Sequence, residues 1–484
     1  MILDLLYILL VVVLMPVFVY KALAQGKYVR GLGQRLGHVR RRYSLQPLLW
    51  LHAVSVGEVN AARPLIKRIR QDLPEFKLRV SVTTQTGYNR ACELLDKEEV
   101  FYFPFDLSWV VSRVFRRLRP SLVILMELEV WYNFMARAQR FKVPVIVANG
   151  RMTAKSKRAY RMAGTITSRM FRRVRHVFAQ DEEIAERFRA VGIPAEQITV
   201  AGTMKYDATL VANEAPGSQE LAQALGIRPT HHLWVAGCTG PGEEEEILTV
   251  HQQLLQDGHA NIRLAIIPRH PERFAEVASL IRVRGFSLRR RSQHPDLPIE
   301  QTPEGPRVAG FGLLAPVSPL PRDTVVLGDT MGELTKFYSL ARVVFVGRSL
   351  VPLGGSDMME PAGLGKPVVF GPHTFNFAEP VKALLEAKAA FEIANAGKLP
   401  PILQQLLGDP GLARDIGQRA QQVILNHKGA TEKHMKLICQ ILGKSADHPG
   451  RTIAPPASKL RPEAQGLRLE VASLTPQTPS PIKR

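Results

Sequence analysis

From about residue 48 onward the chain repeats one hydrophobic pattern: a short apolar run, a turn rich in Gly, Thr or Asn, and an amphipathic helical stretch. This alternation is typical of a parallel sheet covered by helices. The first half of the chain contains six such apolar runs, at 48–54, 77–83, 121–126, 144–148, 176–179 and 198–201. The pattern therefore predicts a doubly wound, Rossmann-like α/β domain over residues 45–210.

The stretch 211–230 lacks an apolar run and contains Pro, Gly and Ser, so we interpret it as a linker. The pattern then restarts, with predicted strands at 233–237, 262–267, 324–327, 342–346 and 367–370. These strands indicate a second Rossmann-like domain over 231–442, interrupted by a Pro-rich loop at 293–321. The composition of residues 445–484 predicts a disordered tail. Two such domains would face a cleft, with ligands at the loops that follow the strands.

The N-terminal segment 2–20 is almost wholly apolar, and about 20 helical residues are enough to cross a bilayer core. A cleaved signal peptide is the alternative, because Ala22-Leu23-Ala24 resembles a cleavage site. The segment has no basic residue before it, whereas Lys21 and Lys27 follow it. This asymmetry favours an uncleaved single-pass signal-anchor, with the body of the protein in the cytoplasm.

The chain carries 64 Lys and Arg against 43 Asp and Glu, a formal net charge of +21. This balance favours an anionic partner, which would be nucleic acid, a membrane surface or a phosphorylated substrate. Many arginines gather in clusters at 40–42, 113–119, 169–175 and 289–291, for which solvated helix faces are the simpler explanation. No zinc-finger spacing or RNA-binding aromatic motif accompanies them, so we expect no nucleic acid partner. Three widely spaced cysteines indicate a reducing compartment.

The turn Ser55-Val56-Gly57-Glu58 follows the first predicted strand and precedes a helix. One interpretation is structural: Ser-x-x-Glu before a helix is a capping box, in which both side chains bind backbone N–H groups. The other is chemical: Gly57 allows a tight turn and Glu58 is a general base at the cleft. Because a helix N-terminus favours the carboxylate form, we expect Glu58 to be ionised at neutral pH.

Three loops of the second domain suit an anionic ligand, although each pattern is also common in solvated turns. Arg269 follows a strand, where its guanidinium could bind phosphate through two hydrogen bonds. The loop 328–333 and the loop 354–361 are both glycine-rich and both precede helices, whose free N–H groups suit anions. Glu360 could accept both hydroxyls of a ribose. No metal-ligand pattern stands out, so we predict chemistry without a metal or other cofactor.

Read together, seven segments resemble the Kdo transferase family, glycosyltransferases with the two-domain GT-B architecture. The segments are WLHAVSVGEVNAARPL (50–65), TTQTGYNRA (83–91), FPFD (103–106), ANGRM (148–152), PRHPERF (268–274), GDTMGEL (328–334) and FGPHTFNF (370–377). The resemblance implies transfer of the acidic sugar Kdo from CMP-Kdo to a lipid A precursor of the lipid IVA type, by inverting, metal-independent displacement in lipopolysaccharide core synthesis.

The resemblance also implies roles for single residues. Glu58 occupies the position of the family's catalytic base. The positions that match donor-binding segments of the family are Pro268, Arg269, Met331, Gly332, Glu333, Gly355, Ser356, Asp357 and Glu360. For the acceptor side we predict Ser55, Gly57, Arg151 and Lys155. The expected partners are CMP-Kdo, the lipid A precursor and the anionic surface of the bacterial inner membrane.

One segment departs from the family. Where the family usually reads Gly-Gly-His-Asn-Pro-x-Glu, this chain reads Gly-Gly-Ser-Asp-Met-Met-Glu at 354–360. Asp357 introduces a negative charge near the expected phosphate, which is unfavourable unless a cation offsets it.

Three alternative functions stay open for the chain: a GT-B transferase that uses a UDP-sugar, a membrane-tethered nucleotide-binding protein without turnover, and a protein that binds polyanions.

Overall fold

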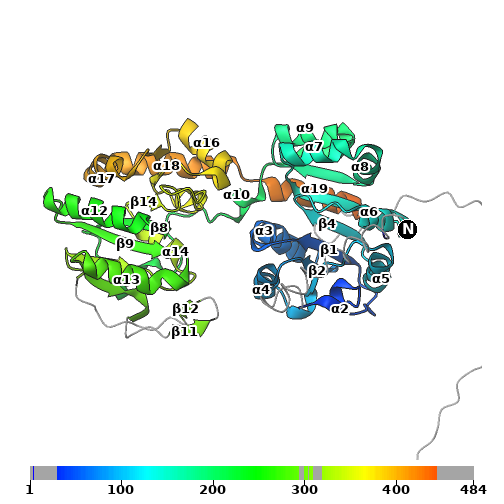
Figure 1. The fold of residues 1–484 in the computed structure, drawn as a ribbon, viewed down its shortest axis with the longest axis horizontal. Coiled ribbons are helices and arrows are strands. Elements are labelled where there is room, and N and C mark those ends of the chain that lie inside the picture. The colour runs from blue at the N-terminus through cyan, green and yellow to red at the C-terminus, as the bar shows by residue number, and fades with distance from the viewer. Residues whose placement is uncertain (1–3, 5–29, 294–298, 303–304, 309–318, 444–484) are drawn as a thin grey trace, which may run out of the picture.

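The computed structural model describes residues 4, 30–293, 299–302, 305–308 and 319–443. Two seven-stranded parallel sheets form the centres of two α/β domains, which lie side by side in Figure 1. The first sheet has the order β3-β2-β1-β4-β5-β6-β7, and the second the order β10-β13-β9-β8-β14-β15-β16. The fold prediction of two doubly wound domains is therefore confirmed for the described residues.

The strands have the following bounds. In the first sheet they are β1 (Leu48–Ala53), β2 (Lys77–Val82), β3 (Val100–Tyr102), β4 (Leu122–Met126), β5 (Val145–Gly150), β6 (His176–Ala179) and β7 (Ile198–Val200). In the second they are β8 (His232–Thr239), β9 (Ile262–Pro268), β10 (Ser287–Arg290), β13 (Thr324–Leu327), β14 (Val343–Val346), β15 (Val368–Phe370) and β16 (Ala390–Glu392). An antiparallel pair joins β11 (Ile299–Thr302) to β12 (Gly305–Val308).

Helices cover both faces of each sheet (Figure 1). Those of the first part of the chain are α2 (Leu32–Arg35), α3 (Val56–Asp72), α4 (Gln85–Leu94), α5 (Ser108–Leu118), α6 (Tyr132–Arg140), α7 (Ala154–Met162), α8 (Gly164–Phe171), α9 (Glu182–Ala190) and α10 (Met204–Ala208). Those of the second part are α11 (Ser218–Leu225), α12 (Glu243–Gln256), α13 (Phe274–Val283), α14 (Leu334–Leu340), α15 (Met359–Gly363), α16 (Ala378–Glu386), α17 (Leu399–Gly408), α18 (Pro410–Asn426) and α19 (Ala430–Ile441).

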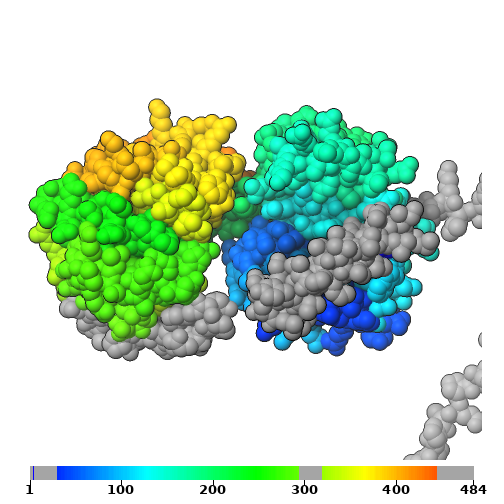
Figure 2. Space-filling view, viewed as in Figure 1, coloured from blue at the N-terminus to red at the C-terminus, as the bar shows by residue number. Residues whose placement is uncertain are grey.

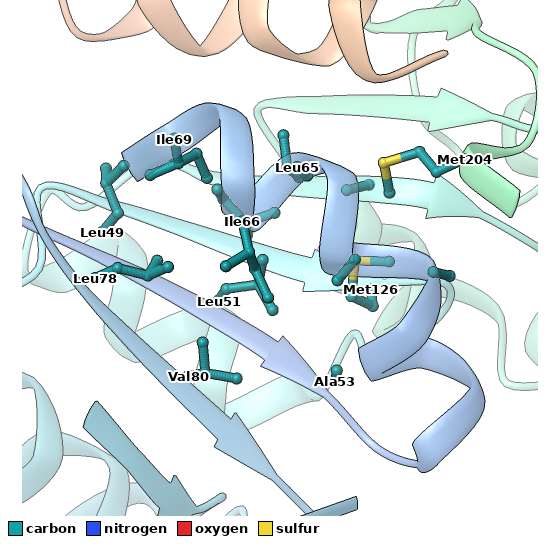
Figure 3. Packing of buried hydrophobic residues seen from close by; sticks show 14 of the residues in the cluster. Leu49, Leu51, Ala53, Leu65, Ile66, Ile69, Leu78, Val80, Met126 and Met204 are labelled. Carbon is teal, nitrogen blue, oxygen red and sulfur yellow. The ribbon is translucent and has the colours of Figure 1, made fainter. Parts of the chain in front are cut away.

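The helix α3 shows why the first domain folds as it does. Its apolar residues recur at helical spacing, and Leu65, Ile66 and Ile69 belong to one core with Leu49 and Leu51 of β1; in Figure 3, Ile66 points toward Leu51. Burying one such side chain stabilises the fold by about 1.5–3 kcal/mol. This packing fixes the first turn of α3 at the carboxyl end of β1.

The last helix, α19, departs from the order of the chain. It follows the second sheet in sequence, yet it lies in the first domain (Figure 1), where Met435 and Ile438 belong to the core. The range 231–442 expected for the second domain includes this helix. Its amphipathic pattern shows that one face is buried, but not which sheet buries it.

Three parts of the secondary structure differ from the prediction. The linker predicted at 211–230 contains the helix α11, which packs into the core of the second domain. The strands β3, β10 and β16 were not predicted, because three or four residues at a sheet edge give too little alternation to recognise. The loop predicted at 293–321 is wrong in part, since β11 and β12 lie within it.

The predicted membrane anchor at 2–20 lies outside the described residues apart from Asp4, as does the tail 445–484. No helix within the described ranges is both long enough and apolar enough to cross a membrane.

Candidate functional site

The predicted residues fall at the carboxyl ends of the two sheets. All strands of both sheets are parallel, but the order in which they are added switches sides of the sheet between β1 and β4 in the first sheet and between β8 and β14 in the second. Ligands of doubly wound sheets bind at these switch points. We call Glu58, Glu127, Glu129 and Arg151 the first-sheet cluster, and Arg269, Ser356, Asp357 and Glu360 the second-sheet cluster.

Glu58 lies in the first turn of α3, behind Ser55 and Gly57. Its Oε2 accepts a hydrogen bond from the Val54 N–H at 2.8 Å, and the Ser55 hydroxyl also bonds to the carboxyl group. The Ser55 side chain accepts no bond from the first N–H groups of the helix, so the reciprocal capping box is not formed. The Glu58 side chain is therefore available for chemistry at the carboxyl end of the first sheet.

The protonation of Glu58 differs from the prediction. Burial raises the pKa of this carboxyl from 4.5 to about 8, and the charges of Glu127 and Glu129 raise it further, against the bonds from Val54 and Ser55. The expectation that Glu58 is ionised at neutral pH is therefore wrong for the free protein. The stabilisation offered by a helix N-terminus is outweighed by desolvation and by two like charges.

Glu127 and Glu129 were missed by the sequence reasoning. Glu127 follows β4 in the left-handed backbone conformation, with φ of 53°, which a non-glycine residue adopts at some cost. Burial raises the pKa of Glu127, and the positive charges of Arg151 and Lys205 oppose that rise. The available signal was the pair of acidic residues directly after the apolar run 121–126.

Glu129 is the carboxyl group of the first-sheet cluster whose pKa is lowered. Burial would raise its pKa, but the nearby His52 ring and the hydrogen bond from Trp131 outweigh burial and lower it. The Trp131 Nε1 donates to Oε2 of Glu129 at 3.0 Å, and the His52 Nε2 lies 3.9 Å from the same oxygen. The carboxyl group of Glu129, whose pKa is lowered, thus lies beside two carboxyl groups whose pKa values are raised.

Of the residues predicted for the acceptor side, Arg151 joins the cluster through its charge on Glu127. Lys155 lies on the exposed first turn of α7, a helix without any buried residue.

In the second-sheet cluster, Arg269 follows directly on Pro268 at the end of β9. The Arg269 N–H donates to the Thr239 carbonyl at 3.1 Å, which ties this loop to the end of β8. Burial raises the pKa of Glu360, Asp357 raises it further, and the Thr335 hydroxyl and Arg269 oppose the rise. The Thr335 hydroxyl donates directly to the Glu360 carboxylate.

In the segment that departs from the family, Gly354, Gly355 and Ser356 are buried and Asp357 is half-buried. Burial raises the pKa of Asp357, while the Met359 N–H, which donates to Oδ1 at 2.9 Å, and Lys205 oppose this rise. Ser356 is buried beside the Cys238 thiol. Gly354 and Gly355 have φ of 86° and 75°, so this turn depends on glycine.

The loop before this segment is shaped by a residue that the sequence reasoning missed. The buried Glu243 carboxylate accepts four backbone N–H groups: Oε2 binds those of Gly240 and Arg348 at 2.8 and 2.6 Å, and Oε1 those of Ser349 and Leu350 at 2.9 Å each. A carboxylate with this many donors fixes a loop strongly. Glu243 stands in a run of four glutamates, and nothing in that run singles it out.

Two ion pairs stabilise the predicted donor loop around Met331, Gly332 and Glu333. The Glu333 carboxylate is buried and pairs with Arg291, with Nε to Oε2 at 2.8 Å and Nη2 to Oε1 at 3.1 Å. Arg290 pairs likewise with the buried Asp329 at 2.7 Å. Because the Glu333 carboxylate already forms a buried ion pair with Arg291, the part of this loop that can contact a ligand is the backbone of residues 331 and 332.

These ion pairs correct the interpretation of the cluster at 289–291 as a solvated helix face, because Arg291 is buried and both Arg290 and Arg291 are paired with carboxylates. A different cluster does line the surface. A hollow of about 620 Å³ is bordered by Arg41, Arg113, Phe115, Arg116, Arg117, Arg119, Pro120, Phe141 and Val143.

Within the described part of the chain, no group of three His, Cys, Asp or Glu side chains is arranged to hold a metal ion.

The family model and two of the most similar curated proteins carry the description 3-deoxy-D-manno-octulosonic acid transferase. The family described as 3-Deoxy-D-manno-octulosonic-acid transferase (kdotransferase) matches residues 30–208. The 3-deoxy-D-manno-octulosonic acid transferase of Haemophilus influenzae is 31% identical over 420 residues, which are 85% of this chain and 91% of that protein. The protein of the same name from Bordetella pertussis is 31% identical over 409 residues, 82% of this chain and 87% of the relative.

Among solved structures, a glycosyltransferase from Rickettsia africae covers 83% of this chain and 100% of its own, with a TM-score of 0.52 and 12% identity. That likeness concerns the fold alone. The C-terminal CMP-Kdo binding domain of WaaA from Acinetobacter baumannii is 27% identical, covers 43% of this chain and 95% of its own, and has a TM-score of 0.36.

Proposed function

Because the chain belongs to the family of 3-deoxy-D-manno-octulosonic acid (Kdo) transferases, glycosyltransferases of lipopolysaccharide synthesis, we propose that it transfers Kdo from CMP-Kdo to a lipid A precursor of the lipid IVA type. The observation that carries the proposal is the pairing of two sites at the carboxyl ends of two sheets. One holds a carboxyl group, Glu58, suited to accept a proton. The other holds a cation, Arg269, suited to bind a phosphate.

The proposed reaction is a single displacement with inversion and without a metal. An acceptor hydroxyl oxygen attacks the anomeric carbon of Kdo, and the bond from that carbon to the phosphate oxygen of CMP breaks. The electron pair leaves with CMP, whose phosphate is stabilised by Arg269. The hydroxyl proton passes to Glu58, which must therefore be ionised when the acceptor binds. The positive charges of Arg151 and Lys205 favour the ionised form of the neighbouring Glu127.

For the donor, we propose that Glu360 holds the ribose hydroxyls and that the backbone of Met331, Gly332 and Gly355 lies along the nucleotide. Glu360 is held by the Thr335 hydroxyl in a half-buried position that suits this role.

For location, we propose that residues 2–20 anchor the chain in the bacterial inner membrane, with both domains in the cytoplasm. The arginines of the surface hollow would then add to membrane binding, at about 1 kcal/mol for each basic residue near an anionic surface.

The test is transfer by the purified full-length protein in detergent, with CMP-Kdo generated in the reaction and a tetra-acylated lipid A precursor as acceptor. The mass of the product should rise by one or more Kdo units. The product should be absent with Glu58→Gln and present with Glu386→Gln, a matched change at an exposed glutamate.

Two outcomes would overturn the proposal. If CMP binds but no product forms, the protein binds a nucleotide without transferring Kdo. If UDP displaces CMP efficiently, the donor is a different sugar nucleotide.

A further inference from the structure

The amino ends of the second sheet border a hollow that the proposed reaction does not use. The hollow has a volume of about 450 Å³, and its lining includes His231, Arg342 and Pro367. These three residues directly precede β8, β14 and β15, which are neighbours in the sheet. Because the strands of this sheet are parallel, the hollow lies at the opposite end of the sheet from the loop that carries Arg269.

The hollow belongs to one domain alone. Figure 2 shows the two domains as separate lobes, and every residue that lines the hollow comes from the second of them. Besides the three turns before the strands, the lining comes from α11, the end of α14 and the first turn of α18. The hollow is therefore distinct from the proposed donor site and from the junction between the domains.

Positive charge gathers in this hollow without any acidic residue in the lining. The basic residues of the lining are Arg228, His231, Arg342, Lys366 and Arg414. Among the described residues, no carboxylate oxygen lies within 4.0 Å of the side-chain nitrogens of these arginines or of Lys366. Like charges gathered in one hollow repel one another, so the arrangement is unfavourable unless an anion joins it.

Lys366 is the most telling of these cations, because its side chain is half-buried. Burial lowers the pKa of its ammonium group, and the charge of Glu214 opposes this change. The Glu214 carboxylate accepts the Ser218 hydroxyl at 3.0 Å and lies beyond ion-pair distance of the Lys366 Nζ. An ammonium group that is partly removed from water gains stability when a bound anion pairs with it.

A purely structural explanation covers only part of this set. Cations also stabilise helix C-termini, and Nη1 of Arg342 donates to the Leu407 carbonyl at 2.9 Å, in the last turn of α17. In the described part of the chain, the Lys366 Nζ makes no such bond to a carbonyl. Asp409, at the start of α18, accepts the N–H groups of Gly411 and Leu412 and so caps its own helix. Helix ends therefore account for Arg342 in part and leave Lys366 unexplained.

The size and charge of the hollow suit a phosphorylated ligand. Its volume lies within the range of about 300–1,000 Å³ found for small-molecule pockets. A guanidinium binds two oxygens of one phosphate, and an ammonium group binds phosphate as a point charge. Several cations without an acid match a ligand with two phosphate groups better than one with a single carboxylate.

We propose that this hollow is a second anion-binding site, which takes a small molecule that carries a diphosphate or two phosphate groups. Lys366 and Arg342, which are half-buried, bind the phosphate oxygens inside the hollow, and the exposed Arg228 and Arg414 bind them at its rim. The site does not depend on the proposed function, because it shares no residue with the two clusters described above.

The test is titration of the full-length protein in detergent with inorganic pyrophosphate, followed by calorimetry. Arg269 and the arginine-lined hollow of the first domain could also bind the probe, so the starting protein carries Arg269→Met and Arg116→Met. It should still bind one equivalent of pyrophosphate. Adding Lys366→Met should weaken this binding about 10- to 100-fold, the usual range for losing a hydrogen bond to a charged group. Adding Lys382→Met instead removes an exposed lysine of the same domain and should leave the affinity unchanged.

Urea unfolding separates binding from a structural role of Lys366. Without pyrophosphate, Lys366→Met should keep or raise the unfolding midpoint, because it removes a half-buried cation without an ion pair. With pyrophosphate, the midpoint of the starting protein should rise and that of the Lys366→Met protein should not. A lower midpoint for Lys366→Met without the probe would mean that the lysine serves the fold and would overturn the assignment.

Two further results would also overturn the proposal. If Lys366→Met leaves the affinity for pyrophosphate unchanged, the anion does not bind in this hollow. If short-chain phosphatidylglycerol binds more tightly than pyrophosphate and this binding is lost with Lys366→Met, the hollow takes a lipid headgroup and not a soluble ligand.

Discussion

Glu58 gives the sharpest prediction, because its pKa of about 8 lies within the range of an ordinary activity assay. A carboxyl group with this pKa is about 10% ionised at pH 7, about 1% at pH 6 and half ionised at pH 8. If Glu58 is the base, kcat/KM for the acceptor should rise about 50-fold from pH 6 to pH 8 and then level off.

The raised pKa of Glu58 also predicts that its contribution to the stability of the folded protein falls as the pH rises, whereas the rate of transfer rises. A carboxyl whose pKa is raised by folding stabilises the folded state below its ordinary pKa of 4.5, and this contribution is lost as the pH rises through about 8. The shift corresponds to a ceiling of about 5 kcal/mol, which we reduce to about 1–2 kcal/mol because Glu58 is partly exposed. Glu58→Gln, which cannot ionise, should therefore be more stable than wild type at pH 9 but not at pH 5.

Both effects can be measured on the same preparations, by initial rates of transfer and by thermal unfolding between pH 5 and pH 9. Glu127→Gln is the informative control, since removing a like charge should lower the pKa of Glu58 and move the rise in rate to lower pH. A rate that is flat between pH 6 and pH 8, with a stability difference that does not change with pH, would refute the reasoning.

Three further changes test other parts of the structure. Arg291→Met leaves the buried Glu333 carboxylate without its main partner and should lower the unfolding free energy by about 3 kcal/mol, measured by urea denaturation; an unchanged midpoint would refute it. His434→Leu removes the ring nitrogen that accepts the Asn149 N–H at 3.1 Å and should cost about 1–3 kcal/mol in the same assay, with no loss contradicting the role of that bond. Asp357→Asn removes a negative charge near the proposed donor and should tighten CMP-Kdo binding about 3-fold or more by calorimetry, whereas weaker binding would mean that the carboxylate is needed.

The fold could be predicted from the sequence because its central strands are long and apolar. The strands β1, β8 and β9 have six to eight residues each, and their apolar runs stand out between helical stretches. What could not be predicted is where an amphipathic helix packs. The helices α17 and α19 have similar patterns, yet the first lies on the second sheet and the second on the first.

The site was predicted where chemistry depends on a turn after a strand, as at Glu58 and Arg269. It was incomplete where chemistry depends on the convergence of distant segments. The pKa of Glu58 is set partly by Glu127 and Glu129, which lie about 70 residues further along the chain.

The packing of α19 against the first domain has a consequence for the order of folding during synthesis. This helix is joined to α10 by the Asp207 carboxylate, which accepts the N–H groups of Gly429 and Thr431 at 2.7 and 2.5 Å, and to α3 by an ion pair between Arg68 and Glu432 at 2.8 Å.

A ribosome releases the chain from its N-terminus, so β1–β7 emerge more than 200 residues before the helix that completes their core. Until then, the face of α3 that receives Met435 and Ile438 is open to water or to other proteins. Domains that emerge first generally fold first, and exposed apolar surface on such intermediates promotes aggregation. The nascent first domain would therefore need a chaperone for longer than its own length suggests, and a stop codon just before α19 would damage the domain farthest from it in sequence.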